Sequence, residues 1–474
     1  MPISKAFIPS TIHIEPRVCF ETTLRDFSII LGTFVLRKDR NAMHIRDLTT
    51  PNANITQGWV SQPNGRGTFD ILQSCVITVL LCSWSVLVLH VPSPSKGRWH
   101  IFLGKMYWMA FTLIFPEVTS AVAAEQHESA SQSVKDFALL QDPTHPQWTM
   151  RHAFFADMGG FFLHSPDFPP FPVDSQQMKY LVAKGYISFP DVDEETIKDK
   201  NKADGFARVI MILQTTWFFL QVVARAIQHL SVSTLELAVL GFVFCTYIST
   251  VLWWKKPLDV GTPIILKTDV LMADILLKAG DGAKEPYGMT PLDFVDALPS
   301  TSTVTPFWFA LGYLFRIGVP PKNRPIDFFP NSRTTPPRGL GTPIMMFETI
   351  GAIAFVGIHL IGWNFTLPTN LELLFWRVAN LTLVAIMVCY LLFLHIGGLI
   401  AARVGRILFK KDARTALDLL RLCPAWFLIL TLGPVVGLYS IARLYVIVEA
   451  LVGLRALPTD AYDTVDWTFF IPHM

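Results

Sequence analysis

Seven long apolar segments constrain this chain more than any other feature of its sequence. They cover residues 70–91, 101–122, 206–228, 233–254, 344–366, 378–401 and 424–447. Each is close to the roughly 20 residues that a helix needs to cross the hydrocarbon of a bilayer. Only 16% of the residues are charged, against roughly 25% in soluble domains. We therefore predict an all-α, integral membrane helical bundle, in contact with the lipid bilayer.

The number of crossings depends on an eighth segment. Residues 306–319 are apolar but short, and they contain Arg316. They could cross the membrane, lie at its interface or re-enter it, so the prediction is seven or eight transmembrane helices.

Polar segments divide the chain into seven regions. A hairpin that crosses twice would place the two large polar stretches on one side, where we expect an extramembrane cap. The predicted regions are a polar N-terminal region 1–68, a first transmembrane hairpin 69–122, a polar extramembrane insertion 123–204, a second hairpin 205–255, a polar and Pro-rich connecting region 256–343, a C-terminal transmembrane bundle 344–457 and an acidic tail 458–474.

Lysine and arginine in short loops indicate the orientation, because they favour the cytoplasmic side. The loop 403–414 is strongly basic, whereas the tail after Pro458 has three aspartates and no basic residue. Seven crossings would put the N-terminus in the cytoplasm and eight would put it in the lumen. The basic N-terminal region favours seven crossings, whereas the sequon at Asn54 favours eight if it is glycosylated. We expect the endoplasmic reticulum or another endomembrane.

Composition and missing motifs exclude several functions. A net charge of +2 gives no indication of nucleic-acid binding. The six cysteines form neither a CxxC pair nor a Cys/His metal spacing. The nucleophile elbow, the HExxH motif, the P-loop and the dinucleotide fingerprint do not occur. We therefore expect no metal and no cofactor, and the sequence leaves the oligomeric state open.

Ionisable residues inside apolar segments are the candidate catalytic groups, because such residues are costly in a membrane and mark functional sites. Glu348 and His359 lie on one face of the segment 344–366, about 16 Å apart. Glu117 follows Pro116 at a predicted kink. A buried carboxyl group can stay protonated and act as an acid, and a histidine can accept or donate a proton. The alternative is that all three only hydrogen-bond to neighbouring helices.

A polar stripe follows one face of the segment 206–228. Gln214, Trp217, Gln221 and Arg225 are spaced three or four residues apart, and they could line a substrate site or hold helices together. Glu236 begins the next segment, where it could pair with Arg225.

Two further histidines allow other chemistry. His395 lies within an apolar segment and precedes two glycines, which also suits the general base of a membrane-bound acyltransferase. His152 and Asp157 lie together in the sequence HAFFADMGGF, which could instead be an amphipathic element on the membrane.

Several stretches together resemble a large fungal family of multi-pass integral membrane proteins. The resemblance covers residues 58–474 and implies the integral-membrane architecture. Where the family pattern has a second Gly and a Cys around the histidine, this chain has Val356 and Leu360, which affects the shape of the pocket. The stretches are QPNGRGTFDILQSC, HAFFADMGGF, DKNKADGFAR, LQTTWFFLQVVAR, LWWKKPLDV, GIHLIGWNFTLPT and FIPHM.

The leading functional hypothesis is a membrane-embedded enzyme that acts on a lipophilic small-molecule substrate. By analogy with fungal integral-membrane cyclases, it would be a proton-initiated terpenoid cyclase or isomerase of secondary metabolism. Glu348, His359 or Glu117 would supply the proton, and the rings of Trp217, Phe355 and Trp363 would shield the cation. The alternatives are an acyltransferase, a transporter or a membrane scaffold.

Overall fold

The structure is a computed structural model in which helices predominate. It describes residues 56–61, 65–140, 147–200, 205–284, 286–295, 324–331, 343–410, 419, 422–423 and 425–470. The apolar segment 306–319 and the sequon at Asn54 lie outside the described residues.

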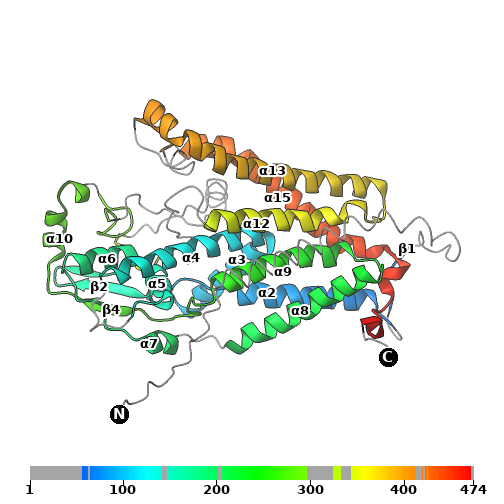
Figure 1. Ribbon diagram of the computed structural model, residues 1–474, viewed down its shortest axis with the longest axis horizontal. Helices are drawn as coiled ribbons and strands as arrows, with labels where there is room; N and C mark the ends of the chain where they lie inside the picture. The colour runs from blue at the N-terminus through cyan, green and yellow to red at the C-terminus, as the bar shows by residue number, and fades with distance from the viewer. Residues whose placement is uncertain are drawn as a thin grey trace, which may run out of the picture.

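Six long helices run side by side along the longest axis of the molecule (Figure 1). They are α2 (Thr68–Ser85), α8 (Gly205–Ile227), α9 (Thr234–Leu252), α12 (Pro343–Ile361), α13 (Asn370–Val404) and α15 (Ala425–Val452). Five of them contain stretches long and apolar enough to cross a membrane, and α12 holds a shorter apolar stretch. This is compatible with a membrane protein. The central helix is α9, in which 72% of the apolar stretch is buried, against 28–39% in the other four candidates.

One end of this bundle is closed by contacts between helix ends. Arg66, just before α2, pairs with Glu236 at the start of α9. At the same end, the indole of Trp376 in α13 donates to the carbonyl of Gly362, which follows α12, at 3.1 Å. Gly453, after α15, packs against Thr234. The start of α2 and the end of α15 therefore lie together, and we call this the tail end.

Short elements complete the tail end. Strand β1 (Thr56–Gln57) pairs antiparallel with β5 (Leu457–Pro458). The helical turns η2 (Gly362–Asn364), η4 (Gly453–Arg455), η5 (Thr459–Tyr462) and η6 (Trp467–Phe470) also lie here. Two further turns lie elsewhere in the chain, η1 (Gly280–Ala283) and the π-helix η3 (Gly405–Phe409).

The predicted apolar segment 101–122 is not one straight helix. It is divided between α3 (Arg98–Ile114) and α4 (Pro116–Ala138), which are bent by 109° at Phe115. Proline at the first position of α4 has no N–H to continue the hydrogen bonding of α3, which explains the break. Helix α4 then runs beside α9 and α12 (Figure 1).

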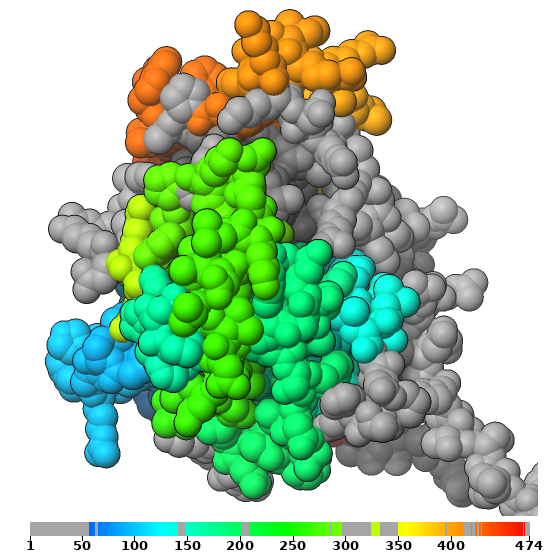
Figure 2. All heavy atoms as spheres, turned by 90° about the vertical axis from the view of Figure 1, so that its left-hand side faces the viewer, coloured from blue at the N-terminus to red at the C-terminus, as the bar shows by residue number. Residues whose placement is uncertain are grey.

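The end of the bundle opposite the tail end carries a separate unit with its own core, which we call the cap (Figures 1 and 2). Its sheet has the order β3–β2–β4, with β2 antiparallel to β3 and parallel to β4. The predicted all-α fold contained no such sheet. The two large polar stretches do come together in this unit. The elements are α5 (Met150–Asp157), β2 (Phe161–Ser165), β3 (Phe168–Val173), α6 (Ser175–Ala183), α7 (Glu194–Asp199), β4 (Ile264–Lys267) and α10 (Met272–Ala279).

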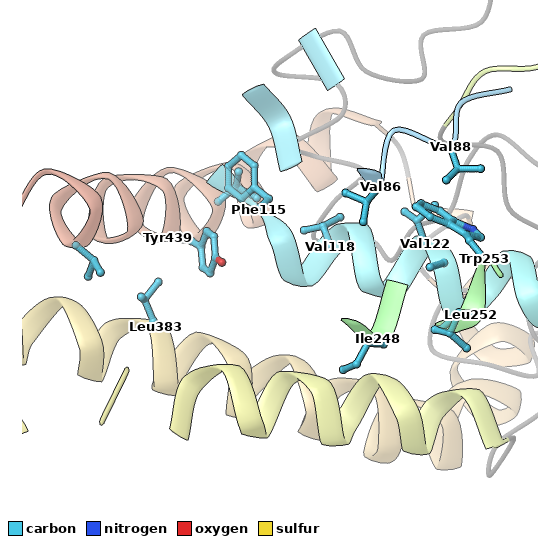
Figure 3. Packing of buried hydrophobic residues seen from close by; sticks show 14 of the residues in the cluster. Val86, Val88, Phe115, Val118, Val122, Ile248, Leu252, Trp253, Leu383 and Tyr439 are labelled. Atoms are coloured by element: carbon cyan, nitrogen blue, oxygen red, sulfur yellow. The ribbon is translucent and has the colours of Figure 1, made fainter. Parts of the chain in front are cut away.

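Two hydrophobic cores meet along α4. The core of the bundle gathers Val118 and Val122 of α4 with Ile248 of α9 and Tyr439 of α15 (Figure 3). The core of the cap includes Phe137, from the other end of α4. Helix α4 thus fixes the cap to the bundle and carries Glu117 into the bundle interior.

Candidate functional site

Two of the three predicted catalytic residues are joined through α15. The hydroxyl of Tyr439 donates a hydrogen bond to the carboxyl group of Glu117 in α4. One turn further along α15, Nη1 of Arg443 lies 3.0 Å from Nε2 of His359 in α12. All four side chains are buried. We call Glu117, Tyr439, Arg443 and His359 the polar cluster.

The helix break positions the polar cluster. Because α3 stops at Ile114, its carbonyl group is free to accept a hydrogen bond from Nε of Arg443 at 3.1 Å. Glu117 lies in the first turn of α4, where the positive end of the helix dipole favours a carboxylate. The ring of Phe115, at the break, stacks on Tyr439 with centroids 5.9 Å apart (Figure 3). The break therefore supplies both an acceptor for Arg443 and the place for Glu117.

The hydrogen bonds of His359 define its protonation state. A carbonyl oxygen can only accept, so Nδ1, which lies 2.9 Å from the Phe355 oxygen, carries the proton. A guanidinium can only donate, so Nε2 accepts from Arg443. The ring is a neutral imidazole with both nitrogens satisfied, packed against Gly241. In this state His359 is not the predicted proton donor, and it holds Arg443 in place.

The carboxyl group of Glu117 is only partly satisfied. Its Oε1 accepts from Tyr439, whereas its buried Oε2 has no hydrogen-bond partner within the described part of the chain. Protonation removes the charge of a carboxyl group, so it lowers the cost of burying an oxygen that lacks a hydrogen-bond partner. Glu117 is therefore the strongest candidate for the predicted acid.

Two other predicted groups cannot be assigned contacts. Glu348 lies in α12 and His395 in α13, but their side chains lie outside the described residues. Their roles as an acid and as an acyltransferase base stay predictions.

The predicted cation-shielding rings in α12 and η2 already bind cations of the protein. The guanidinium of Arg443 lies 4.7 Å from the centroid of Phe355. That of Arg377 lies 5.3 Å from the centroid of Trp363. One face of each ring therefore already contacts a guanidinium of the protein.

The polar stripe of α8 holds the C-terminal tail. Arg225 is 2% exposed, and its guanidinium donates to main-chain carbonyls of Ser231 and of the tail segment 460–463. Trp217 stacks on Trp467 of the tail, with centroids 5.1 Å apart. Here Arg225 and Trp217 bind the protein itself.

The rest of the stripe differs from the prediction in one contact. The salt bridge that Arg225 could have formed with Glu236 does not form, because Glu236 pairs with Arg66 and also caps the start of α9 through Ser233. Gln214 and Gln221 are half-buried on α8, and their predicted role in substrate binding stays a prediction.

A third buried cation, after Arg443 and Arg225, lies where the cap meets the bundle. Nζ of Lys256 is 2.9 Å from the Val88 carbonyl and 2.7 Å from Oε1 of Gln126. The ring of Trp253 lies 4.9 Å from the same atom. Burial lowers the pKa of Lys256 to about 7, although Asp157 nearby acts in the opposite direction. The sequence LWWKKPLDV contained this lysine, but two adjacent lysines gave no reason to choose the buried one.

His152 and Asp157 do not form a pair. His152 lies 2.7 Å from the Val192 carbonyl through Nε2 and contacts Thr149 through Nδ1. Asp157 accepts hydrogen bonds from Ser129 and Ser175. Burial lowers the pKa of His152 and raises the pKa of Asp157. Both residues act as structural contacts of the cap.

Sequence reasoning missed Tyr439 and Arg443 as partners of the predicted acid. Their spacing of four residues in an apolar segment was visible, and it places both on one face of α15. The partner Glu117 is 322 residues away in sequence, and no local pattern could connect them.

The general class of this protein is therefore a mostly helical bundle that buries a carboxyl group and several cations in its interior. The chain belongs to the family of unknown function DUF8562, whose model matches residues 41–279 and 345–474. All four residues of the polar cluster fall in these matched ranges. A comparison with curated proteins and with solved structures finds no match.

Proposed function

We propose that this protein is a membrane-embedded enzyme that acts on a lipophilic intermediate of fungal secondary metabolism by proton transfer. It would be an isomerase or a cyclase of terpenoid type. The observation that carries the proposal is the Glu117–Tyr439 pair, a carboxyl group and a phenol hydrogen-bonded to each other in the bundle interior. The free Oε2 of Glu117 is the atom from which a proton can be given.

The proposed step is a transfer between Glu117 and an oxygen of the substrate. The protonated carboxyl group gives its proton to a carbonyl or epoxide oxygen. The carboxylate that results keeps the hydrogen bond from Tyr439, and it takes a proton from a neighbouring carbon of the substrate. For a carbonyl substrate this gives the enol and restores the acid, so the step itself balances without an oxidant or a reductant.

An oxygen is a better acceptor here than an alkene carbon. Arg443 lies one helical turn from Tyr439, about 6 Å along α15, and its guanidinium is permanently charged. A carbocation formed beside this charge would be repelled by it, and the ring face of Phe355 is already occupied by Arg443. Charge that develops on an oxygen can instead be stabilised by hydrogen-bond donors.

We infer six full crossings instead of seven or eight, because the pair α3–α4 begins and ends at one end of the bundle and does not cross the membrane. Lys256 binds Val88, before α3, and Gln126, after the break. The chain therefore enters α3 and leaves along α4 at the same end of the bundle. The cap would then lie outside the membrane at this end, and the basic loop 403–414 favours the cytoplasmic side for it.

The test is expression in a fungal host, followed by untargeted mass spectrometry of lipophilic extracts. Wild type is compared with Glu117→Gln and Tyr439→Phe. Glu449→Gln and Tyr445→Phe are the matched controls, because they form a second Tyr–Glu pair on α15, 3.3 Å apart. Protein levels are measured in each strain.

We expect a new or isomerised metabolite with wild type and with both controls. It should fall at least about a hundredfold with Glu117→Gln, the range that removal of a general acid gives, and less with Tyr439→Phe. Full product formation with Glu117→Gln at normal protein levels would contradict the proposal.

A transporter is the second candidate, because broken helices near the middle of the membrane are typical of secondary transporters. The observation that favours it is the 109° bend beside the polar cluster. A transporter would change the distribution of a metabolite between cells and medium without changing its structure. The same extracts, analysed separately for cells and medium, distinguish the two functions.

A further inference from the structure

Helix α3 presents an unusually exposed apolar surface. Trp99 is 67% exposed, and Phe102, Leu103 and Tyr107 are each more than 40% exposed. Thr112 is the one fully buried residue of this helix. Helix α3 therefore packs little of its surface against the rest of the described chain.

The direction of α3 differs from that of the bundle. Helix α4 runs along α9, and α3 is bent away from α4 by 109°. Lys105 in α3 forms a salt bridge of 2.7 Å with Asp259, in the connection between α9 and the cap. A helix that crosses the bundle direction at the cap end lies close to the plane of the membrane surface.

The charges of this segment have one sign. Residues 94–116 contain Lys96, Arg98 and Lys105 but no aspartate or glutamate, and Lys96 and Arg98 are exposed. A basic residue in the first turn opposes the helix dipole, which favours anions there. Asp259 compensates for Lys105, whereas Lys96 and Arg98 form no salt bridge within the described part of the chain, so negative charge outside the chain would be favourable beside these two residues.

We propose that α3 is an interfacial helix that docks on anionic phospholipid headgroups of the cap-side leaflet. The apolar rings enter the boundary of the acyl chains, and Lys96 and Arg98 contact the phosphates. This inference rests on the proposed membrane arrangement but not on the proposed chemistry.

The test uses the full-length protein in nanodiscs that contain phosphatidylcholine alone or mixed with phosphatidylserine. Native mass spectrometry measures how many phosphatidylserine molecules the protein retains after ejection from the disc. The test variant is the double substitution Lys96→Gln and Arg98→Gln, which leaves the salt bridge of Lys105 intact. The control is Lys184→Gln with Lys198→Gln, which removes exposed positive charges from the cap.

We expect wild type and control to retain phosphatidylserine selectively over phosphatidylcholine. The double variant should lose about fivefold in selectivity for each of the two basic residues. Trp99→Ala should weaken retention of both lipids. Equal selectivity in the double variant and wild type would overturn the proposal. So would a dimer that dissociates with Trp99→Ala, because the face would then bind a second copy of the chain.

Carbonate extraction distinguishes a failure of the lipid-docking proposal from a failure of the proposed membrane arrangement. Wild type and all variants should stay in the membrane fraction, because the six long helices are unchanged. Release of the wild type would show that the bundle is not inserted, and it would overturn the inference together with the arrangement.

Discussion

Arg443 and Lys256 show two ways of burying a cation in this fold. Arg443 donates to a neutral imidazole and to a main-chain carbonyl that a helix break leaves free. Lys256 donates to a carbonyl and a carboxamide and lies over an indole ring. In both cases the hydrogen-bond acceptors are uncharged, so burial is offset by directed dipoles and not by a salt bridge. A lysine can lose its proton in such a place, whereas an arginine cannot.

The lysine makes stability depend on pH. Its pKa is about 7 in the folded protein, against 10.5 as the ordinary value. Between these values the unfolded chain binds a proton that the folded chain does not, so stability rises with pH, by about 1.4 kcal/mol per unit at most. We expect Lys256→Met to remove this slope between pH 7 and pH 9 in thermal unfolding of the detergent-solubilised protein.

The adjacent Lys255 is the control, because it is exposed. Lys255→Met should keep the pH slope of the wild type. An unchanged slope in Lys256→Met would show that Lys256 keeps its proton in the folded protein throughout this range.

At the scale of elements, the C-terminal tail is part of the bundle because α8 binds it. Arg225 contributes the main polar contact, Trp217 the aromatic one, and β1 pairs with β5 beside them. Leu457, Ala461 and Tyr462 of the tail also belong to a hydrophobic core shared with α2, α8 and α9. Arg225 adds the hydrogen bonds that hold the main chain of the tail against α8.

We expect Arg225→Gln to loosen this segment. Several buried carbonyls would lose their donor, which costs about 3 kcal/mol and gives about a hundredfold faster amide exchange in residues 457–470. Hydrogen–deuterium exchange with peptide-level mass spectrometry measures this. Arg208→Gln, at the other end of α8, should leave the exchange of the tail unchanged. Equal protection of the tail in both variants would contradict the role of Arg225 in holding it.

At the scale of the whole molecule, the start of the first long helix, α2, and the end of the last one, α15, both lie at the tail end. If the cap faces the cytoplasm, the start of α2 and the C-terminal tail both face the lumen. In sealed microsomes we expect protease to cleave the cap and to spare a tag at the C-terminus. We also expect Asn54 to carry a glycan that PNGase F removes and that Asn54→Gln abolishes. A cleaved C-terminal tag with an intact cap would mean the reverse orientation.

The sequence by itself determined most of the long helices and included Glu117 among three candidate catalytic residues. A run of about 20 apolar residues is a local property, and six of the seven predicted segments fall on single helices, whereas 101–122 is divided between α3 and α4. Proline before Glu117 also indicated the kink, because a missing N–H acts within one turn. The strands of the cap were not found, since short apolar runs in a polar region are ambiguous between helix and strand.

Only the tertiary structure decided which polar groups meet. Glu117 and Tyr439, or Lys256 and Val88, are separated by more than a hundred residues, and hydropathy contains no information about such pairs. The same holds for Arg225, whose partners are main-chain carbonyls that any residue could provide. A sequence shows that a buried polar side chain needs a partner, because the energy of burial demands one. The packing of the helices decides which partner is within reach.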